Sequence, residues 1–178
     1  MVMYRTALAL TLLLLSGAAA GQTIIESVAA KVNQTVITYS EILQEGALLN
    51  IENGLPMQTP LSKELREKIL DTLIVRTILS LEARERSLPV NEQAVTEMLA
   101  TYEKLPFLSE FLTAFELTPL EFRMIVKKRL VVRLMTDEFL KRKFKTGDVR
   151  PEEERNKAVE EWFTTLRKKH RIINYTLP

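Results

Sequence analysis

The sequence predicts a mainly α-helical domain with one small β-sheet. Apolar residues recur at helical spacing through most of residues 62–169, and two capping boxes mark helix starts. Short alternating segments occur only at the two ends, in residues 27–38 and 171–177. Because a lone hairpin is marginal in water, the C-terminal strand should join the two N-terminal strands in one sheet that ties the ends together.

The N-terminal part predicts a hairpin followed by a helix. Val28, Ala30 and Val32 alternate with more polar positions, a turn follows at residues 33–35, and Val36 continues a second short strand. Thr38 can then cap a helix while the side chain three residues later reaches back, which is a capping box. This helix should run to about residue 51.

The rest of the chain predicts a series of helices. Ser62 caps a long helix to about residue 87, whose centre, residues 70–81, is apolar nearly all round. Such a helix is enclosed by others, so it should form the centre of the core. Further helices are expected at 92–104, 107–115, 118–145 and 152–169, with a capping box at Thr118 and a tight connection at 147–151.

The first twenty residues read as a secretory signal peptide. Residues 1–5 carry one positive charge, residues 6–15 are uncharged and mostly apolar, and residues 18–20 form an A-x-A cleavage site. The alternative is an uncleaved anchor, but the apolar run is short for a membrane span of about 20 residues. We therefore expect cleavage after Ala20, export to the periplasm, and one domain over residues 21–178, with 151–178 closing it.

The composition points away from familiar catalysis. The 178 residues include no cysteine, five glycines and one histidine, His170, which should lie at the end of the last helix and interact with its dipole. No phosphate-binding glycine motif occurs. No catalytic residue, cofactor or metal site is therefore predicted, and a module that binds another molecule is favoured over an enzyme.

Charge is separated along the chain. Residues 26–121 contain 15 acidic and 8 basic residues, whereas residues 122–178 contain 8 acidic and 16 basic residues. The simplest interpretation is a solvated basic helix that faces the acidic elements. The alternative is contact with acidic partners or an anionic membrane surface. The net charge of only +2 and the absence of a recognition motif argue against nucleic acid.

Aromatic and methionine side chains are concentrated in residues 98–124. One interpretation is core packing, and the other is a groove for apolar peptide segments, for which rings and thioethers are suited. The candidate groove residues are Met98, Tyr102, Phe107, Leu108, Phe111, Phe115 and Met124.

Residues 28–42 resemble the opening of the SurA family of periplasmic chaperones, which has the pattern VAAVVN–x–x–VIT–x–S–E/D. Residues 64–86 resemble the long central helix of the family, and residues 111–123 resemble its F–x–x–x–x–G–L–T–x–x–E–F/Y–R turn, with Glu116 in place of the usual glycine. Residues 158–175 resemble its closing helix and strand. The likeness covers nearly all of residues 26–178.

The resemblance implies a chaperone core that binds unfolded outer-membrane or secreted proteins without ATP. In this family, one or two parvulin-type prolyl isomerase domains usually lie between the basic helix and the closing helix. Here only residues 146–150 join these two helices, and the resemblance therefore implies a core without the isomerase. A dedicated adaptor or structural subunit with the same fold and one specific partner is the alternative. The oligomeric state stays open.

Overall fold

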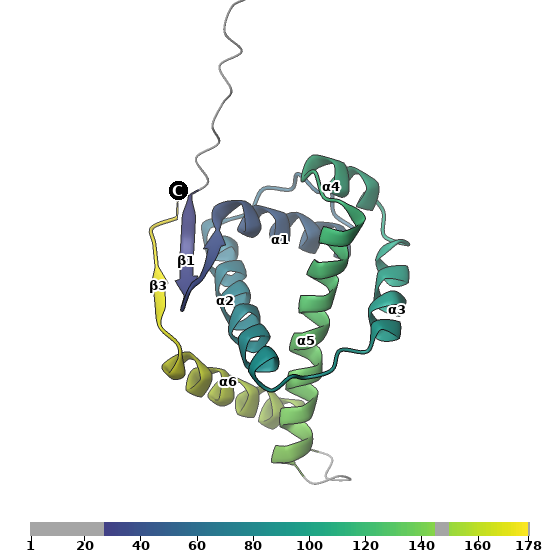
Figure 1. Ribbon diagram of the computed structural model, residues 1–178. Helices are drawn as coiled ribbons and strands as arrows, with labels where there is room; N and C mark the ends of the chain where they lie inside the picture. Colours follow the sequence, from purple (N-terminus) through teal and green to yellow (C-terminus); the bar gives the residue numbers. More distant parts are fainter. Residues whose placement is uncertain (1–26, 145–149, 178) are drawn as a thin grey trace, which may run out of the picture.

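The computed structural model describes residues 27–144 and 150–177. It confirms the predicted fold class: six helices and a three-stranded antiparallel sheet (Figure 1). The predicted signal peptide and most of the predicted connection at 147–151 lie outside the described residues. Within the described part of the chain, no helix is both long and apolar enough to cross a membrane.

The sheet joins the two ends of the described chain, as predicted. Strands β1 (Val28–Val32) and β2 (Thr35–Thr38) form the hairpin, and β3 (Ile172–Asn174) pairs antiparallel with the other edge of β1. The strand order is therefore β2-β1-β3. Ala30 and Val32 of the central strand are completely buried, since their side chains face the helices.

Helix α1 (Tyr39–Glu52) begins at the predicted capping box. The Glu41 amide donates to Thr38 Oγ1 at 3.2 Å, and the Thr38 amide donates to Glu41 Oε2 at 2.9 Å. Near the other end of α1, buried Asn50 donates through Nδ2 to the carbonyl oxygens of Met57 and Thr59, at 3.3 and 3.0 Å. This side chain therefore holds the loop between α1 and the next helix.

Helix α2 (Lys63–Glu85) lies at the centre of the fold, as predicted, and packs against α1, α5, α6 and the sheet (Figure 1). The remaining helices are α3 (Glu92–Tyr102), α4 (Leu108–Ala114), α5 (Pro119–Lys143) and α6 (Glu152–Lys169). The predicted capping box at Thr118 is present at the start of α5. Most predicted helix ends agree with these bounds to within two residues.

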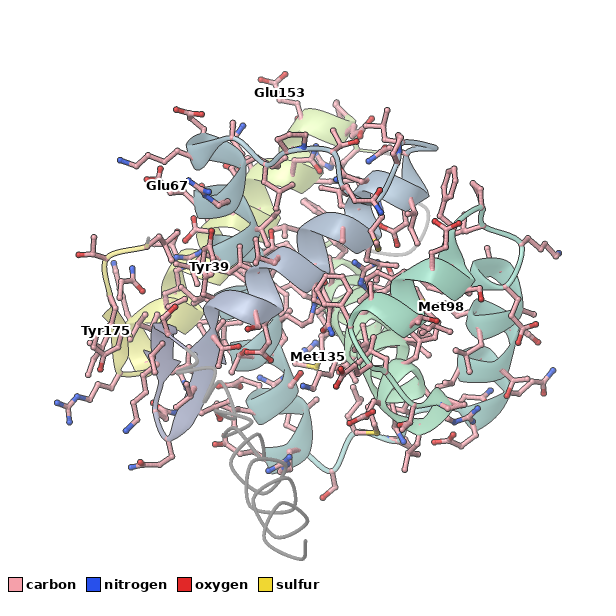
Figure 2. The ribbon with its side chains drawn as sticks, turned by 90° about the horizontal axis from the view of Figure 1, so that it is seen from above. Tyr39, Glu67, Met98, Met135, Glu153 and Tyr175 are labelled. Atoms are coloured by element: carbon pink, nitrogen blue, oxygen red, sulfur yellow. The ribbon has the colours of Figure 1, made fainter. Side chains whose placement is uncertain are left out.

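The buried apolar residues form two clusters. The first lies between the sheet, α2, α5 and α6, and contains Ile74 and Met135, both completely buried. Met135 accordingly lies near the middle of the molecule in Figure 2, whereas Glu153 and Tyr175 lie at its edge. The second cluster lies between α1, α3, α4 and α5 and includes Phe111. Helix α5 contributes to both clusters and therefore connects them.

The only histidine of the chain helps to fasten the C-terminal segment. The Arg171 amide donates to Asn33 Oδ1 at 3.0 Å, so the Asn33 amide nitrogen faces His170 Nδ1, at 2.9 Å. Nδ1 must therefore accept, which leaves the other ring nitrogen, Nε2, to donate to Glu82 Oε1 at 3.3 Å. His170 thus connects the hairpin turn, α2 and the end of α6.

Candidate functional site

The structure distributes the seven predicted groove residues over three environments. Tyr102, Leu108 and Phe111 are buried, and Met98 and Phe115 are half-buried. Phe107 and Met124 are exposed, at 41% and 47% of their surface. The seven side chains therefore do not line a single surface.

Most of the aromatic side chains pack in the second core cluster. The ring of Phe111 lies 5.1 Å from that of Phe115 and 6.2 Å from that of Phe122, while Tyr102 meets Phe122 edge-on at 5.5 Å. Such contacts stabilise a core. Phe111, which is completely buried, is therefore a stability determinant in this structure.

Two of the seven residues, Met98 and Tyr102, line cavities. One cavity, of about 550 Å³, lies between α1, α2, α5 and α6, with α3 contributing these two side chains to its wall. A second, of about 630 Å³, lies between α3 and α5. Because Glu52, Met98 and Tyr102 line both cavities, we treat the two as one feature, the central groove.

The walls of the central groove combine apolar and charged side chains. In the first cavity, half-buried apolar side chains come from α2, α5 and α6 as well as from α3. They are Val75, Val132, Phe163 and Met98. An ion pair between Arg167 and Asp71, 3.2 Å apart, belongs to the same lining. Apolar side chains supply contact area in ligand sites, and polar groups among them fix the orientation of the ligand.

A network of charged side chains also lines the groove. Glu45 of α1 accepts from both terminal nitrogens of Arg76, at 2.6 and 2.7 Å, and from Arg129 Nη2 at 2.6 Å. Arg129 Nη1 also donates to Glu52 and to the Tyr102 hydroxyl, which itself donates to Glu52 at 2.7 Å. Two carboxylates therefore balance two guanidinium groups, and the network joins α1, α2, α3 and α5.

Burial makes this charge network strongly coupled. The side chains of Glu45, Arg76 and Arg129 are only 11–12% exposed. Burial alone raises the pKa of Glu45, but the hydrogen bonds and positive charges of Arg76 and Arg129 outweigh it, and the pKa falls below its ordinary value. Burial would lower the pKa of Arg129, but the neighbouring carboxylates and Tyr102 raise it.

Tyr102 responds to the same environment. Burial and the Glu52 carboxylate raise the pKa of Tyr102 to about 12, against the opposing effect of Arg129. The Arg129 guanidinium carbon lies 5.8 Å from the centre of the Tyr102 ring. The hydroxyl is therefore protonated at neutral pH and is available as the donor to Glu52.

Sequence reasoning missed this network. The centre of α2 was interpreted as apolar nearly all round, yet Arg76 lies within that stretch and is buried. A charged residue in an otherwise apolar helical run was the available signal, because such a residue needs a buried partner. Nothing local in the sequence identifies Glu45, 31 positions earlier, as that partner.

Three basic side chains of α5 pair with acidic residues of other helices, as the simplest interpretation of its charge expects, whereas Lys128, Arg133 and Lys141 are exposed. Arg123 and Lys127 of α5 both pair with Glu92 at the start of α3, each at 2.7 Å. Arg129 pairs with Glu45 and Glu52 of α1. Within the described ranges, no group of three or more histidine, aspartate or glutamate residues is arranged to hold a metal ion.

Comparison with known protein families assigns the chain to one of them. The family model described as SurA-like N-terminal domain matches residues 2–136, which is more than half of the chain. The chain therefore belongs to the SurA-like N-terminal domain family, a chaperone-type family, as the resemblance implied. No curated protein matches the chain. The match ends before α6 and β3, so their likeness to the closing elements of the family stays an interpretation.

Proposed function

We propose that this protein is an ATP-independent periplasmic chaperone that holds apolar and aromatic segments of unfolded outer-membrane or secreted proteins in the central groove. The observation that carries the proposal is the pair of cavities that share Glu52, Met98 and Tyr102. Membership of a chaperone-type family supports the same function.

The dimensions and lining of the groove suit an extended segment with apolar side chains. Cavities of about 550 and 630 Å³ fall within the range of typical ligand sites, roughly 300–1,000 Å³. Each large apolar side chain that a client buries contributes about 1.5–3 kcal/mol, offset by the cost of ordering the segment. We therefore expect micromolar dissociation constants, which permit release without ATP.

The balanced charges in the groove suit this role as well. Because the carboxylates and guanidinium groups of the network satisfy one another, the lining presents little net charge to a client. A client backbone can meet polar atoms there, while its side chains contact Val75, Val132 and Phe163. Phe107 and Met124, which are exposed, are available to extend the contact outside the groove.

Light scattering of an aggregating outer-membrane protein tests the proposal. We expect the wild-type chain to suppress aggregation, and the groove variant Met98→Ser/Val132→Ser to lose most of that suppression. The matched control Leu55→Ser/Leu120→Ser removes two exposed apolar side chains, 44% and 69% exposed, that lie outside the groove lining. The proposal that clients bind in the central groove would be refuted if the wild-type chain did not suppress aggregation, or if both variants lost suppression equally.

A third variant, Phe107→Ser/Met124→Ser, tests the exposed members of the seven predicted residues. If they extend the binding surface, suppression falls by less than in the groove variant. Phe111→Ser is unsuitable for this purpose, because Phe111 is completely buried and its loss would unfold the second core cluster. Circular dichroism should confirm that every variant remains folded.

A pull-down from periplasm distinguishes the chaperone from the alternative, a dedicated adaptor with one partner. A chaperone should bring down many proteins in substoichiometric amounts, whereas an adaptor should bring down one protein in stoichiometric amount. We also expect no acceleration of a proline-limited refolding reaction, because the proposal assigns no isomerase activity to the chain. N-terminal sequencing of the exported protein should begin at Gly21 if the signal peptide is cleaved after Ala20.

A further inference from the structure

A second concave feature adjoins the central groove at α6, where the centres of the Trp162 and Phe163 rings lie 5.3 Å apart. It is a shallow depression of about 340 Å³ that five residues line: Arg86, Phe139, Arg142, Lys143 and Trp162. We call it the aromatic–cationic depression. It combines the end of α2, the end of α5 and the middle of α6, and it shares no lining residue with the central groove.

The aromatic part of the depression is a stacked pair of rings. The centres of the Phe139 and Trp162 rings are 4.5 Å apart and their planes differ by only 3°. Both side chains are half-buried, so the pair presents part of its surface to solvent. Because the rings come from different helices and support each other, they form a rigid apolar surface.

The rim of the depression is cationic. Arg86 pairs with buried Glu82 at 2.8 Å, and Arg142 pairs with half-buried Glu138 at 3.5 Å. Within residues 27–144 and 150–177, no carboxylate forms an ion pair with Lys143. The positions three and four residues from either ring carry no acidic side chain. Three cationic side chains and two paired carboxylates therefore leave the rim with an excess of positive charge.

We propose that the aromatic–cationic depression docks an acidic segment of a partner protein, in which carboxylates flank an aromatic or large aliphatic side chain. The apolar side chain would lie against Phe139 and Trp162, and the carboxylates would pair with Arg142 and Lys143. Tryptophan and arginine are enriched among the residues that dominate protein–protein binding energy. The complementary charge would orient the segment and speed its association.

A protein segment fits the depression better than an anionic bilayer does. A membrane-binding surface inserts exposed apolar side chains between lipids, whereas Phe139 and Trp162 are stacked on each other and half-buried. A projecting side chain can reach a recessed ring pair that a flat lipid surface cannot. The depression shares no lining residue with the central groove, but the two adjoin, because the centres of the Trp162 and Phe163 rings lie 5.3 Å apart. The charge-reversal variant described below separates the two sites, because it changes no residue of the groove lining.

The chain itself provides the probe, because Trp162 is its only tryptophan. The full chain is titrated with the peptide acetyl-Gly-Asp-Phe-Glu-Asp-Gly-amide while tryptophan fluorescence is recorded. A matched peptide carries asparagine and glutamine in place of the acids. We expect a saturable change with the acidic peptide only, weakened by salt at about 0.5 M. Calorimetry on Trp162→Phe, which keeps a stacked ring, should show binding retained.

Charge reversal locates the site. Arg142→Glu/Lys143→Glu should weaken binding of the acidic peptide at least about tenfold, or 1.4 kcal/mol. The control Lys141→Glu/Lys168→Glu makes the same charge change at two exposed lysines outside the depression and should weaken it less than about threefold. Equal binding of both peptides, or equal weakening by both variants, overturns the proposal. The proposal is also overturned if phosphatidylglycerol vesicles cause a saturable change in Trp162 fluorescence and the acidic peptide causes none.

Discussion

Replacing Arg129 with methionine should destabilise the protein more than any other change on the same helix that leaves the apolar core intact. Arg129 makes hydrogen bonds with Glu45, Glu52 and the Tyr102 hydroxyl, and its side chain is only 12% exposed. Removing one partner from a buried charge network typically costs about 3–5 kcal/mol, because the remaining charges lose their compensation. Methionine keeps most of the side-chain volume, so the loss would reflect charge rather than a cavity.

Urea unfolding monitored by circular dichroism measures this change in the free energy of unfolding. Arg133→Met is the matched control, because Arg133 is an exposed arginine one turn further along α5 and its loss should change stability by less than about 0.5 kcal/mol. A loss below about 1 kcal/mol for Arg129→Met would refute the reasoning. Such a small loss would show that water solvates Glu45 and Glu52 well enough to replace their bonds to Arg129.

The same argument predicts that removing the whole network is less harmful than removing one member. Glu45→Leu, Glu52→Leu, Arg76→Met and Arg129→Met combined should recover at least half of the stability lost in Arg129→Met alone. Apolar replacement of a complete buried ion network is often neutral or stabilising. Further loss in the combined variant would indicate that specific hydrogen bonds, rather than uncompensated charge, hold α1, α2, α3 and α5 together.

The network also predicts acid sensitivity. Because the pKa of Glu45 is lower in the folded protein than in the unfolded chain, its contribution is present above the ordinary pKa of 4.5 and is lost as the pH falls through the folded value. The wild type should therefore lose more stability between about pH 5 and pH 3 than Glu45→Gln does. Parallel pH profiles of the two proteins would contradict the assignment.

Three further predictions concern single side chains. Ultraviolet titration should show one tyrosine ionising near pH 12, absent in Tyr102→Phe, and wild-type stability should fall as the pH rises from the ordinary value of 10 toward 12. Identical titration curves for the wild type and Tyr102→Phe above pH 11 would contradict this. Asn33→Ala should destabilise the protein by about 1–3 kcal/mol and speed amide exchange in β3, because it removes bonds to His170 and Arg171; unchanged exchange would contradict it. Thr118→Ala should lower the free energy of unfolding by about 1 kcal/mol, because it removes the capping box of α5. In thermal unfolding, the control Thr165→Ala at an exposed position within α6 should lower it by less.

The local elements were predictable because their signals are local. The capping boxes at Thr38 and Thr118 each depend on two side chains three positions apart, so the starts of α1 and α5 are readable from short stretches of sequence. The apolar centre of α2 likewise predicted its enclosed position, and β3 was predicted to join the hairpin because two strands alone are marginal.

The candidate site depended on tertiary structure, because its residues are brought together from helices far apart in the chain. An aromatic side chain at helical spacing has the same sequence pattern whether it faces a core or a groove, and packing alone buried Phe111 while leaving Phe107 exposed. Arg129 reads as one of many basic residues in a charged helix. Only the arrangement of α1, α2 and α3 around it decided that it is buried with Glu45, Glu52 and Tyr102, since burial and charge pairing are properties of the assembled helices.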